Sequence, residues 1–189
     1  MGGTSTGTGK VVVNRSMSLD GFIAGPGDAM SWIFDYIPGG AETQFPEVMA
    51  ATGAALIGRR TSDVGDRMAD PDNDEPEPGY DAGELFVLTH RPPAEPVPGV
   101  TFLAGDIREA VATALAAAGG KNLEILGADV AAQCLRAGLV DEIMVFILPV
   151  LLGDGVRFFS SPDLGRIDLE PLETKRAGDL TILRFRVLK

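Results

Sequence analysis

The chain has 189 residues, of which 45% are hydrophobic, and a formal net charge of -11 at pH 7. Its size and composition predict one globular domain over residues 10–189, behind a flexible Gly- and Thr-rich tail at residues 1–9. The acidic balance argues against nucleic-acid binding, which depends on clustered Lys and Arg. Because the sequence has no apolar signal segment and no apolar run of about 18 residues, we expect a cytoplasmic protein that does not bind membranes.

The first half of the domain is predicted to alternate strands with loops and helices. Residues 10–16 are apolar and β-branched, as expected of a strand that is buried on both faces. A second strand over 54–58 ends in Gly and leads directly into a helix that begins at Arg59. The remaining segments are an irregular Gly-rich loop over 17–43, a short helix over 45–52 and an acidic, Pro-rich surface loop over 69–83.

The second half is predicted to continue the alternation. Asp106 and Glu109 have the spacing of a capping box, which predicts a helix that begins there and ends at Gly119 and Gly120. The other expected elements are strands over 85–89, 100–103, 123–127 and 142–149 and a helix over 128–137.

The carboxyl-terminal segment is predicted to form an antiparallel hairpin. Residues 173–176 pair with 179–188 around a turn at Ala177 and Gly178. Apolar residues alternate with charged ones in the second strand, with Leu183, Phe185 and Val187 opposed to Arg184 and Arg186. Strands that alternate with helices and close in a hairpin predict an α/β fold with a mixed, mostly parallel central sheet and helices on both faces.

Ligands of such sheets bind beyond the carboxyl ends of the strands, and three strand ends carry residues suited to an anion. Gly permits a tight turn there, and the first N–H groups of a following helix offer a phosphate site. The three segments are Gly58-Arg59-Arg60-Thr61, Thr89-His90-Arg91 and Gly127-Ala128-Asp129-Val130.

These strand ends allow two interpretations each. Arg59 and Arg60 are either solvated residues of a helix start or phosphate ligands. Because cations at a helix amino terminus oppose its dipole, we expect an anion to compensate them, and guanidinium groups bind phosphate through paired hydrogen bonds. His90, the sole His, is either an exposed turn residue or a ligand. Gly127 and Ala128 alone are compatible with any strand-to-helix turn.

Several sharper motifs are absent. Gly153-Asp154-Gly155 lacks the third Gly of a dinucleotide fingerprint, and the segment ending at Lys10 lacks the first Gly and the final hydroxyl residue of a phosphate loop. Glu75 stands where a calcium loop requires Gly. No nucleophile-elbow sequence indicates Ser-His-Asp catalysis. One His and one Cys cannot build a typical zinc site, so we expect no metal, and Cys134 is interpreted as a small buried hydrophobe.

In chain order, these segments resemble the dihydrofolate-reductase-like superfamily, and most closely the C-terminal reductase domain of the bifunctional deaminase-reductase of riboflavin biosynthesis. The resemblance covers about residues 11–188 and is that of a stand-alone member, since the deaminase half is missing. The segments that carry it are Met17-Ser18-Leu19-Asp20-Gly21-Phe22-Ile23-Ala24, Gly58-Arg59-Arg60-Thr61, Gly127-Ala128, Leu139-Val140-Asp141-Glu142 and Pro149-Val150-Leu151-Leu152-Gly153-Asp154-Gly155.

The resemblance implies a central sheet of about eight strands, NADPH as cofactor and a homodimer. It implies that the Gly58 turn holds phosphate, that the Thr89 segment lies near the adenosine 2′-phosphate, and that the Gly127 turn receives the pyrophosphate. The residues assigned to the cofactor are Ser16, Ile23, Ala24, Gly58, Arg59, Arg60, Thr61, Thr89, His90, Arg91, Gly127, Ala128, Asp129 and Val130, the first three of them at the nicotinamide.

Ala128 departs from the family pattern, which usually has a second Gly at this position. Its methyl group intrudes where the backbone approaches the phosphate. Two candidates for a proton donor are Asp20 and Asp35, and each is alternatively an exposed loop residue. Trp32 is either a wall for a flat heterocycle or part of the core. We assign Trp32 to the substrate together with Gly153 and Gly155.

The ordered motifs lead to one main hypothesis about function. The chain is expected to be an NADPH-dependent reductase that transfers a hydride to a small pterin-like or pyrimidine-like heterocycle or to a ribosyl-derived carbonyl. One rival is a non-catalytic module that binds a nucleotide or a small molecule on the same fold. Another is a flavin-free reductase of unrelated small carbonyls, which the sequence does not distinguish from the first.

Overall fold

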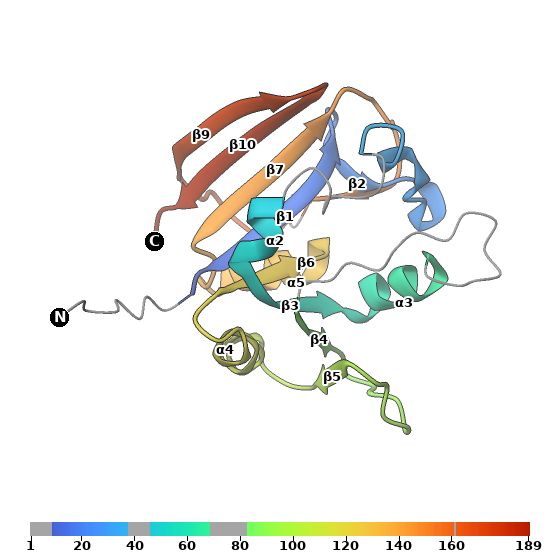
Figure 1. Ribbon diagram of the computed structural model, residues 1–189, viewed down its shortest axis with the longest axis vertical. Coiled ribbons are helices and arrows are strands. Elements are labelled where there is room, and N and C mark those ends of the chain that lie inside the picture. Colours follow the sequence, from blue (N-terminus) through green and yellow to red (C-terminus); the bar gives the residue numbers. More distant parts are fainter. Residues whose placement is uncertain (1–8, 38–45, 69–82, 161) are drawn as a thin grey trace.

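The computed structural model describes residues 9–37, 46–68, 83–160 and 162–189 (Figure 1). Within them, eight strands form one sheet in the order β5-β4-β3-β6-β1-β7-β10-β9. In this order the strands are Val100–Leu103, Glu84–Leu88, Thr52–Gly58, Asn122–Leu126, Val11–Ser18, Glu142–Leu148, Leu180–Val187 and Leu169–Ala177. Most of the predicted tail and of the predicted acidic loop lies outside the described residues.

The sheet is parallel from β5 to β7 and antiparallel from there to its other edge. The neighbouring pairs of β5, β4, β3, β6, β1 and β7 are all parallel, whereas β10 is antiparallel to both β7 and β9. The central strands β6, β1 and β7 are buried along most of their length, as the apolar runs in the sequence require. The predicted α/β fold, with its mostly parallel sheet and closing hairpin, is confirmed.

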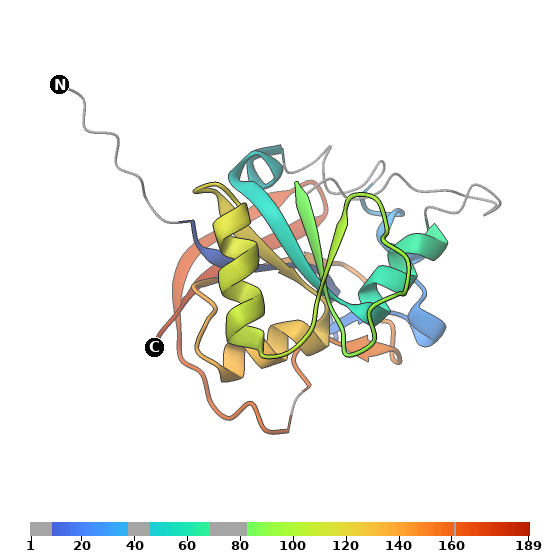
Figure 2. The same ribbon diagram turned by 90° about the horizontal axis from the view of Figure 1, so that it is seen from below.

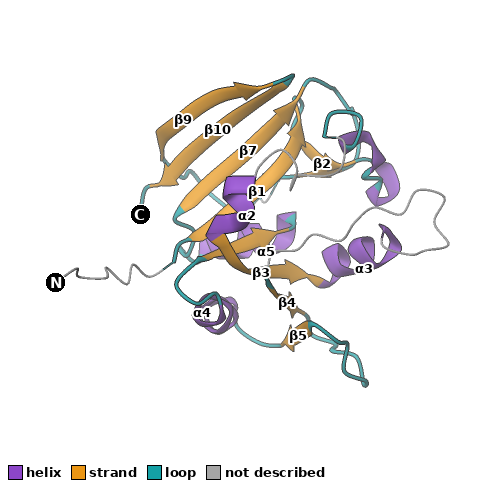
Figure 3. Cartoon of the chain, viewed as in Figure 1, coloured by secondary structure: helices purple, strands orange, loops and turns teal. Residues whose placement is uncertain are grey.

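Helices cover both faces of the sheet (Figures 2 and 3). On one face, α4 (Ile107–Ala117) and α5 (Ala128–Arg136) pack with the inward residues of β3, β6 and β1 in the largest apolar cluster. On the other face, α2 (Pro46–Ala51) and the 3-10 turn η2 (Ser31–Ile33) pack against β7 and β10. A second 3-10 turn, η1 (Pro26–Asp28), precedes η2, and α3 (Arg59–Met68) extends from the end of β3.

Two predicted local features can be compared directly with the structure. Helix α4 begins after Asp106, whose carboxylate accepts a hydrogen bond of 2.7 Å from the backbone N–H of Arg108, so the predicted N-cap is confirmed. The hairpin turn differs by one residue from the prediction, because Leu180 pairs with Ala177 and the turn is therefore Gly178 and Asp179. Gly178 has a φ of 59°, a backbone conformation that Gly adopts without strain.

The prediction of an irregular loop over 17–43 was wrong for two stretches, and its residues 38–43 lie outside the described residues. Met17 and Ser18 belong to the end of β1. Phe22–Ala24 forms strand β2, which pairs antiparallel with β8 (Val156–Arg157) in a separate small sheet. Strands of three and two residues are too short to show a hydrophobic periodicity in the sequence. The two strands are also separated by more than a hundred residues, so their pairing leaves no local pattern. A Cβ at Gly155 would lie 2.1 Å from the carbonyl oxygen of Ala24, so this small sheet requires Gly there.

Strand β10 is buried on both faces over part of its length. Leu183 packs against the largest apolar cluster as its alternation predicts, but Leu180 and Ile182 are also buried, in the cluster formed with β7. Cys134 is buried in α5, and burial raises the pKa of its thiol to about 12, which agrees with its interpretation as a small hydrophobe. None of the described helices combines the length and the apolarity needed to cross a bilayer.

Ile125 provides a test of this core. Its side chain is fully buried in β6, on the face covered by α4 and α5. We expect Ile125→Ala to lower the free energy of unfolding by about 2–5 kcal/mol, because it removes buried apolar surface and leaves a cavity. The matched control is Leu151→Ala, whose side chain is 69% exposed and whose effect should stay within about 0.5 kcal/mol. Urea unfolding measures both, and equal losses would contradict the assigned core.

Candidate functional site

A cavity of about 880 Å³ opens at the carboxyl ends of β3, β4, β6 and β1, the region where ligands bind parallel sheets. Thirteen of the fourteen residues assigned to a cofactor line it. Arg91 is the exception; it is exposed, and its backbone N–H donates to the hydroxyl of Thr89 over 3.1 Å. The residues that line the cavity are Ser16, Ile23, Ala24, Gly58, Arg59, Arg60, Thr61, Thr89, His90, Gly127, Ala128, Asp129 and Val130.

The turn from β6 into α5 passes very close to the start of α3. Gly127 has a φ of 96°, and a Cβ on it would lie 2.4 Å from the Thr61 hydroxyl oxygen, so both the conformation and the space require Gly. Gly127 is the N-cap of α5, and because Gly has no side chain, it cannot accept a hydrogen bond from the first N–H groups of the helix. The first N–H groups of α5 therefore have no side-chain cap and face an opening, as in a phosphate site.

The two arginines at the start of α3 are paired with carboxylates of this chain. Arg59 contacts Asp63 over 2.8 Å, one helical turn further on. Arg60 contacts Asp28 with two nitrogens, its Nε to Oδ2 over 3.0 Å and a terminal nitrogen to Oδ1 over 2.6 Å. The anions expected to compensate these cations are thus supplied, in this structure, by Asp63 and Asp28.

Asp28 is the residue of this group that sequence analysis missed. It ends η1 with a φ of 66°, and among the described residues it is the only non-Gly residue with a positive φ. The hydrogen bond from Arg60 lowers the pKa of Asp28 and raises the pKa of Arg60. Arg67 lies 3.7 Å from the same carboxylate. The sequence offers no signal for this contact, since Asp28 and Arg60 come from separate elements.

Neither predicted proton donor lines the cavity. Asp20 accepts hydrogen bonds from the Ser18 hydroxyl over 2.6 Å and from the backbone N–H groups of Leu152 and Gly153 over 3.2 and 2.8 Å. The Ser18 and backbone hydrogen bonds lower the pKa of Asp20 to about 2, so it is ionised at neutral pH and has no proton to donate. This geometry assigns Asp20 to holding the loop after β7. Asp35 is exposed outside the cavity lining.

The residues assigned to the substrate also lie outside the cavity lining. Trp32 packs against the apolar cluster of β7 and β10, in accordance with the core interpretation. Gly153 donates its N–H to Asp20, and Gly155 supports the contact of β8 with β2. Gly155 does line a second hollow of about 620 Å³, which shares Arg60, Ala128 and Asp129 with the main cavity.

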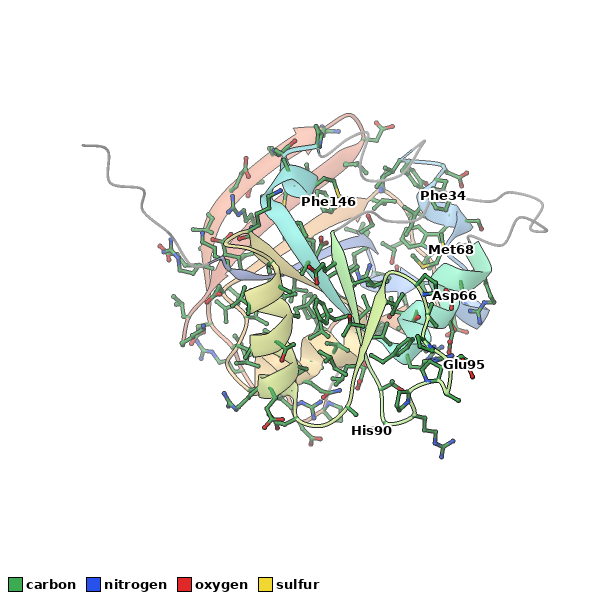
Figure 4. All side chains as sticks on the ribbon, turned by 60° about the horizontal axis from the view of Figure 1, so that its bottom comes forward. Phe34, Asp66, Met68, His90, Glu95 and Phe146 are labelled. Atoms are coloured by element: carbon green, nitrogen blue, oxygen red, sulfur yellow. The ribbon has the colours of Figure 1, made fainter. Side chains whose placement is uncertain are left out.

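The floor and walls of the cavity contain residues that the sequence analysis did not select. Asn14 of β1 and Glu124 of β6 are buried polar residues in the lining, and Phe146 of β7, which pairs with Ser16 of β1, also lines the cavity. Figure 4 shows Phe34, Met68 and Phe146, which reach the lining from three different elements. The position of Glu124 within the apolar run of 122–126 is the signal that could have identified the floor. Burying a charged side chain costs free energy unless the charge is paired or hydrogen-bonded, so a charge in a buried strand indicates a specific role.

The described residues contain no group of three or more His, Cys, Asp and Glu side chains arranged to hold a metal ion. What they contain instead is an elongated cavity with two kinds of surface. The strand ends and helix starts offer backbone N–H groups and guanidinium groups, and the region over β6, β1 and β7 offers a buried carboxylate, an amide and apolar walls. Such a cavity suits a nucleotide next to a small organic molecule.

Comparison with known proteins places the chain in a defined group. The family described as RibD C-terminal domain matches residues 9–183. A protein of Bacillus subtilis (strain 168), YwjB, which is named as uncharacterized, is 25% identical over 151 residues, which are 79% of this chain and 82% of that protein.

Two solved structures share the fold. One is a protein of Shewanella sp. PV-4 that is named for riboflavin biosynthesis, with a TM-score of 0.76, 24% identity and coverage of 95% of this chain and 99% of that one. The other is dihydrofolate reductase from Enterococcus faecalis in complex with NADP(H), with a TM-score of 0.63, 14% identity and coverage of 97% and 99%. The dihydrofolate-reductase-like fold inferred from the sequence is therefore confirmed.

The role assigned to Asp20 predicts a characteristic pH dependence. Since its pKa is lowered from 3.8 to about 2, its stabilising effect is complete above pH 3.8 and is lost as the pH falls through about 2. Asp20→Asn should therefore lower the melting temperature at neutral pH, and its difference from the wild type should shrink as the pH falls from about 4 to about 2.

Thermal unfolding followed by circular dichroism between pH 2 and 7 measures this difference. Ser18→Ala, which removes the donor hydroxyl and leaves the carboxylate, should reproduce part of the loss at neutral pH. A difference between Asp20→Asn and the wild type that stays constant down to pH 2 would contradict the role of the ionised carboxylate.

Proposed function

The chain belongs to the RibD C-terminal domain family, and from this premise we propose that it is an NADPH-dependent reductase. Its substrate is a small pterin-like or pyrimidine-like heterocycle or a ribosyl-derived carbonyl. The observation that carries the proposal is the cavity at the strand ends. It brings together ten residues of the three strand-end motifs and three residues of β1 and β2, Ser16, Ile23 and Ala24. The dihydrofolate reductase of the same fold was solved with NADP(H), which supports the choice of cofactor.

The residues at the strand ends fit the phosphates of such a cofactor. The N-cap of α5 is Gly127, which provides no side-chain cap, so the first backbone N–H groups of the helix can bind an anion. Arg59, Arg60 and Thr61 would hold a further phosphate, and Ser16, Ile23 and Ala24 would border the nicotinamide. When bound, the cofactor supplies the hydride, and the chain supplies binding and orientation.

In this proposal, Arg60 would exchange its ion pair with Asp28 for a phosphate group of the cofactor. Its partner Asp28 belongs to η1, which directly follows β2 and thus the residues assigned to the nicotinamide. A phosphate bound by Arg60 would compete with Asp28 for the same guanidinium group. The Arg60 side chain is 70% exposed and can reach a ligand, whereas the Asp28 side chain is only 16% exposed. After such an exchange Asp28 would keep the contact with Arg67, which lies 3.7 Å away.

A second function, a module that binds a nucleotide without turnover, is supported by one observation. Ala128 lines both the main cavity and the second hollow at the start of α5, where its methyl group narrows the approach of a ligand to the backbone. In the reductase proposal this residue weakens cofactor binding without preventing it, and Ala128→Gly would strengthen it.

The test of the proposal is a calorimetric titration of the purified protein with NADPH and, separately, NADH. The double variant Arg59→Ala, Arg60→Ala should bind NADPH at least about tenfold more weakly, because hydrogen bonds between charged groups are worth about 1.5–3 kcal/mol each and 1.4 kcal/mol is a factor of ten. The matched control is Arg108→Ala, which removes a cation from α4, outside the cavity lining, and should bind as the wild type does.

Turnover separates the two functions. Oxidation of NADPH is followed by absorbance with pterins, aminopyrimidinones and their ribosylated forms as candidate substrates. Tight binding of NADPH without oxidation across this panel would favour the binding module. Failure to bind either nucleotide would overturn both proposals.

A further inference from the structure

The part of the cavity that lies over β6, β1 and β7 has a chemistry different from that of the strand ends. Two polar residues form its floor, Glu124 of β6 and Asn14 of β1, and both line the cavity. Side chains alternate between the two faces of a strand, and β1 pairs with β6 through Val12 opposite Glu124 and Val13 opposite Ile125. Asn14 therefore lies on the same face as Glu124, one step closer to the strand ends.

Both floor residues are buried polar side chains, of which Glu124 is a hydrogen-bond acceptor when ionised and Asn14 carries both an acceptor and donors. Glu124 is 2% exposed and Asn14 is 7% exposed. Among the described residues, the side-chain oxygen of Asn14 has no hydrogen-bond partner, and leaving a buried acceptor unpaired is unfavourable. A carboxylate has roughly four acceptor positions, so Glu124 can accept from a ligand in addition to donors within the chain. A molecule that binds the Glu124 carboxylate must donate hydrogen bonds, and the Asn14 amide can accept or donate one.

Strands β1 and β6 place no Lys or Arg side chain on the face that forms this floor, which disfavours an anion there. All 16 Lys and Arg residues lie in the described part of the chain, because residues 1–8, 38–45, 69–82 and 161 contain none. Those that line the cavity are Arg15, Arg59 and Arg60. Arg59 and Arg60 belong to the start of α3 and are paired with carboxylates. Strand alternation places Arg15 on the opposite face of β1, with Val13 and Met17 of the largest apolar cluster.

The walls above the floor are apolar and adaptable. Three of the six Met residues line the cavity, Met30, Met49 and Met68, together with Phe34 and Phe146. Met side chains adapt to ligands of different shape, and aromatic rings pack against flat groups. Figure 4 shows Met68 and Phe34 in the same region, from the end of α3 and from the segment after η2. These walls suit a planar ring that carries an apolar substituent.

We propose that Glu124 and Asn14 determine substrate specificity and select a planar, phosphate-free molecule that is cationic or rich in N–H donors and carries an apolar group. This inference rests on the proposed function, because it assigns the floor to the substrate and the strand ends to the cofactor. It separates this chain from reductases that act on phosphorylated ribosyl compounds. A phosphate placed at the floor would face the Glu124 carboxylate without a cation to offset the repulsion.

Four probes of similar size and shape test the proposal on the wild-type protein. They are benzamidine, which is a cation with a planar row of N–H donors, benzamide, benzoate and phenyl phosphate. Their affinities are measured by ligand-observed NMR in the absence and in the presence of saturating NADPH. We expect benzamidine to bind at least tenfold more tightly than benzoate and phenyl phosphate, with benzamide in between. Equal affinities, or tighter binding of either anion, would overturn the proposal.

Two isosteric variants test whether the preference for benzamidine depends on the Glu124 carboxylate. Glu124→Gln should reduce the advantage of benzamidine over benzamide at least fivefold and leave the affinity for NADPH unchanged. The matched control is Glu142→Gln, which neutralises a carboxylate that is also buried in the sheet but outside the cavity lining, where it pairs with Lys10 and Arg184. It should retain the wild-type preference. Thermal unfolding establishes that each variant is folded, and a preference that survives in folded Glu124→Gln contradicts the assignment.

The NADPH titration distinguishes the failure of this inference from the failure of the proposed function. Binding of NADPH together with indifference to the four probes would leave the reductase proposal in place and overturn the specificity role of the floor. Preference for benzamidine without any binding of NADPH would support the floor as a binding site for donor-rich cations and overturn the reductase proposal.

Discussion

The position of β6 between β3 and β1 is the constraint on which the rest of the molecule depends. Its hydrogen bonds to both neighbours fix it at the centre of the parallel region. One of its faces therefore packs in the core, and the other faces the cavity. Leu123 and Ile125 face the largest apolar cluster beneath α4 and α5, and Glu124 lies on the opposite face in the cavity floor. The strand ends at Leu126 and is followed by Gly127, whose missing side chain leaves room for Thr61.

The sequence predicted those parts of the fold and of the site that depend on local patterns. The apolar runs of β1, β6 and β7, the N-cap of α4 and the Gly turns at Gly58 and Gly127 are properties of short contiguous segments, and the parallel topology brings their ends together. The pairing of β2 with β8 could not be predicted, because strands of two or three residues gain their stability from a distant partner rather than from their own pattern.

The same reasoning explains which site residues were missed. Asp28 contacts Arg60 only because η1 and α3 are adjacent in space, and nothing in the residues around Asp28 indicates that contact. Asn14 was included in a strand that was interpreted only as buried, although a buried amide needs a partner. Conversely, Asp20 was a candidate proton donor or an exposed loop residue in the sequence, and its three hydrogen bonds give it a structural role at the loop after β7.

The separation of charge along the cavity orients whatever binds there. Backbone N–H groups at α5 and the guanidinium groups of α3 attract the anionic end of a nucleotide, and the Glu124 carboxylate repels it from the floor. In a chain with a net charge of -11, these donors are the groups that would bind the anionic part of the proposed cofactor. A substrate that donates hydrogen bonds is attracted to the opposite end. In the proposed function, the cavity would hold two ligands of opposite electrostatic character in a fixed order, and this order would be set by residues on neighbouring strands of one sheet.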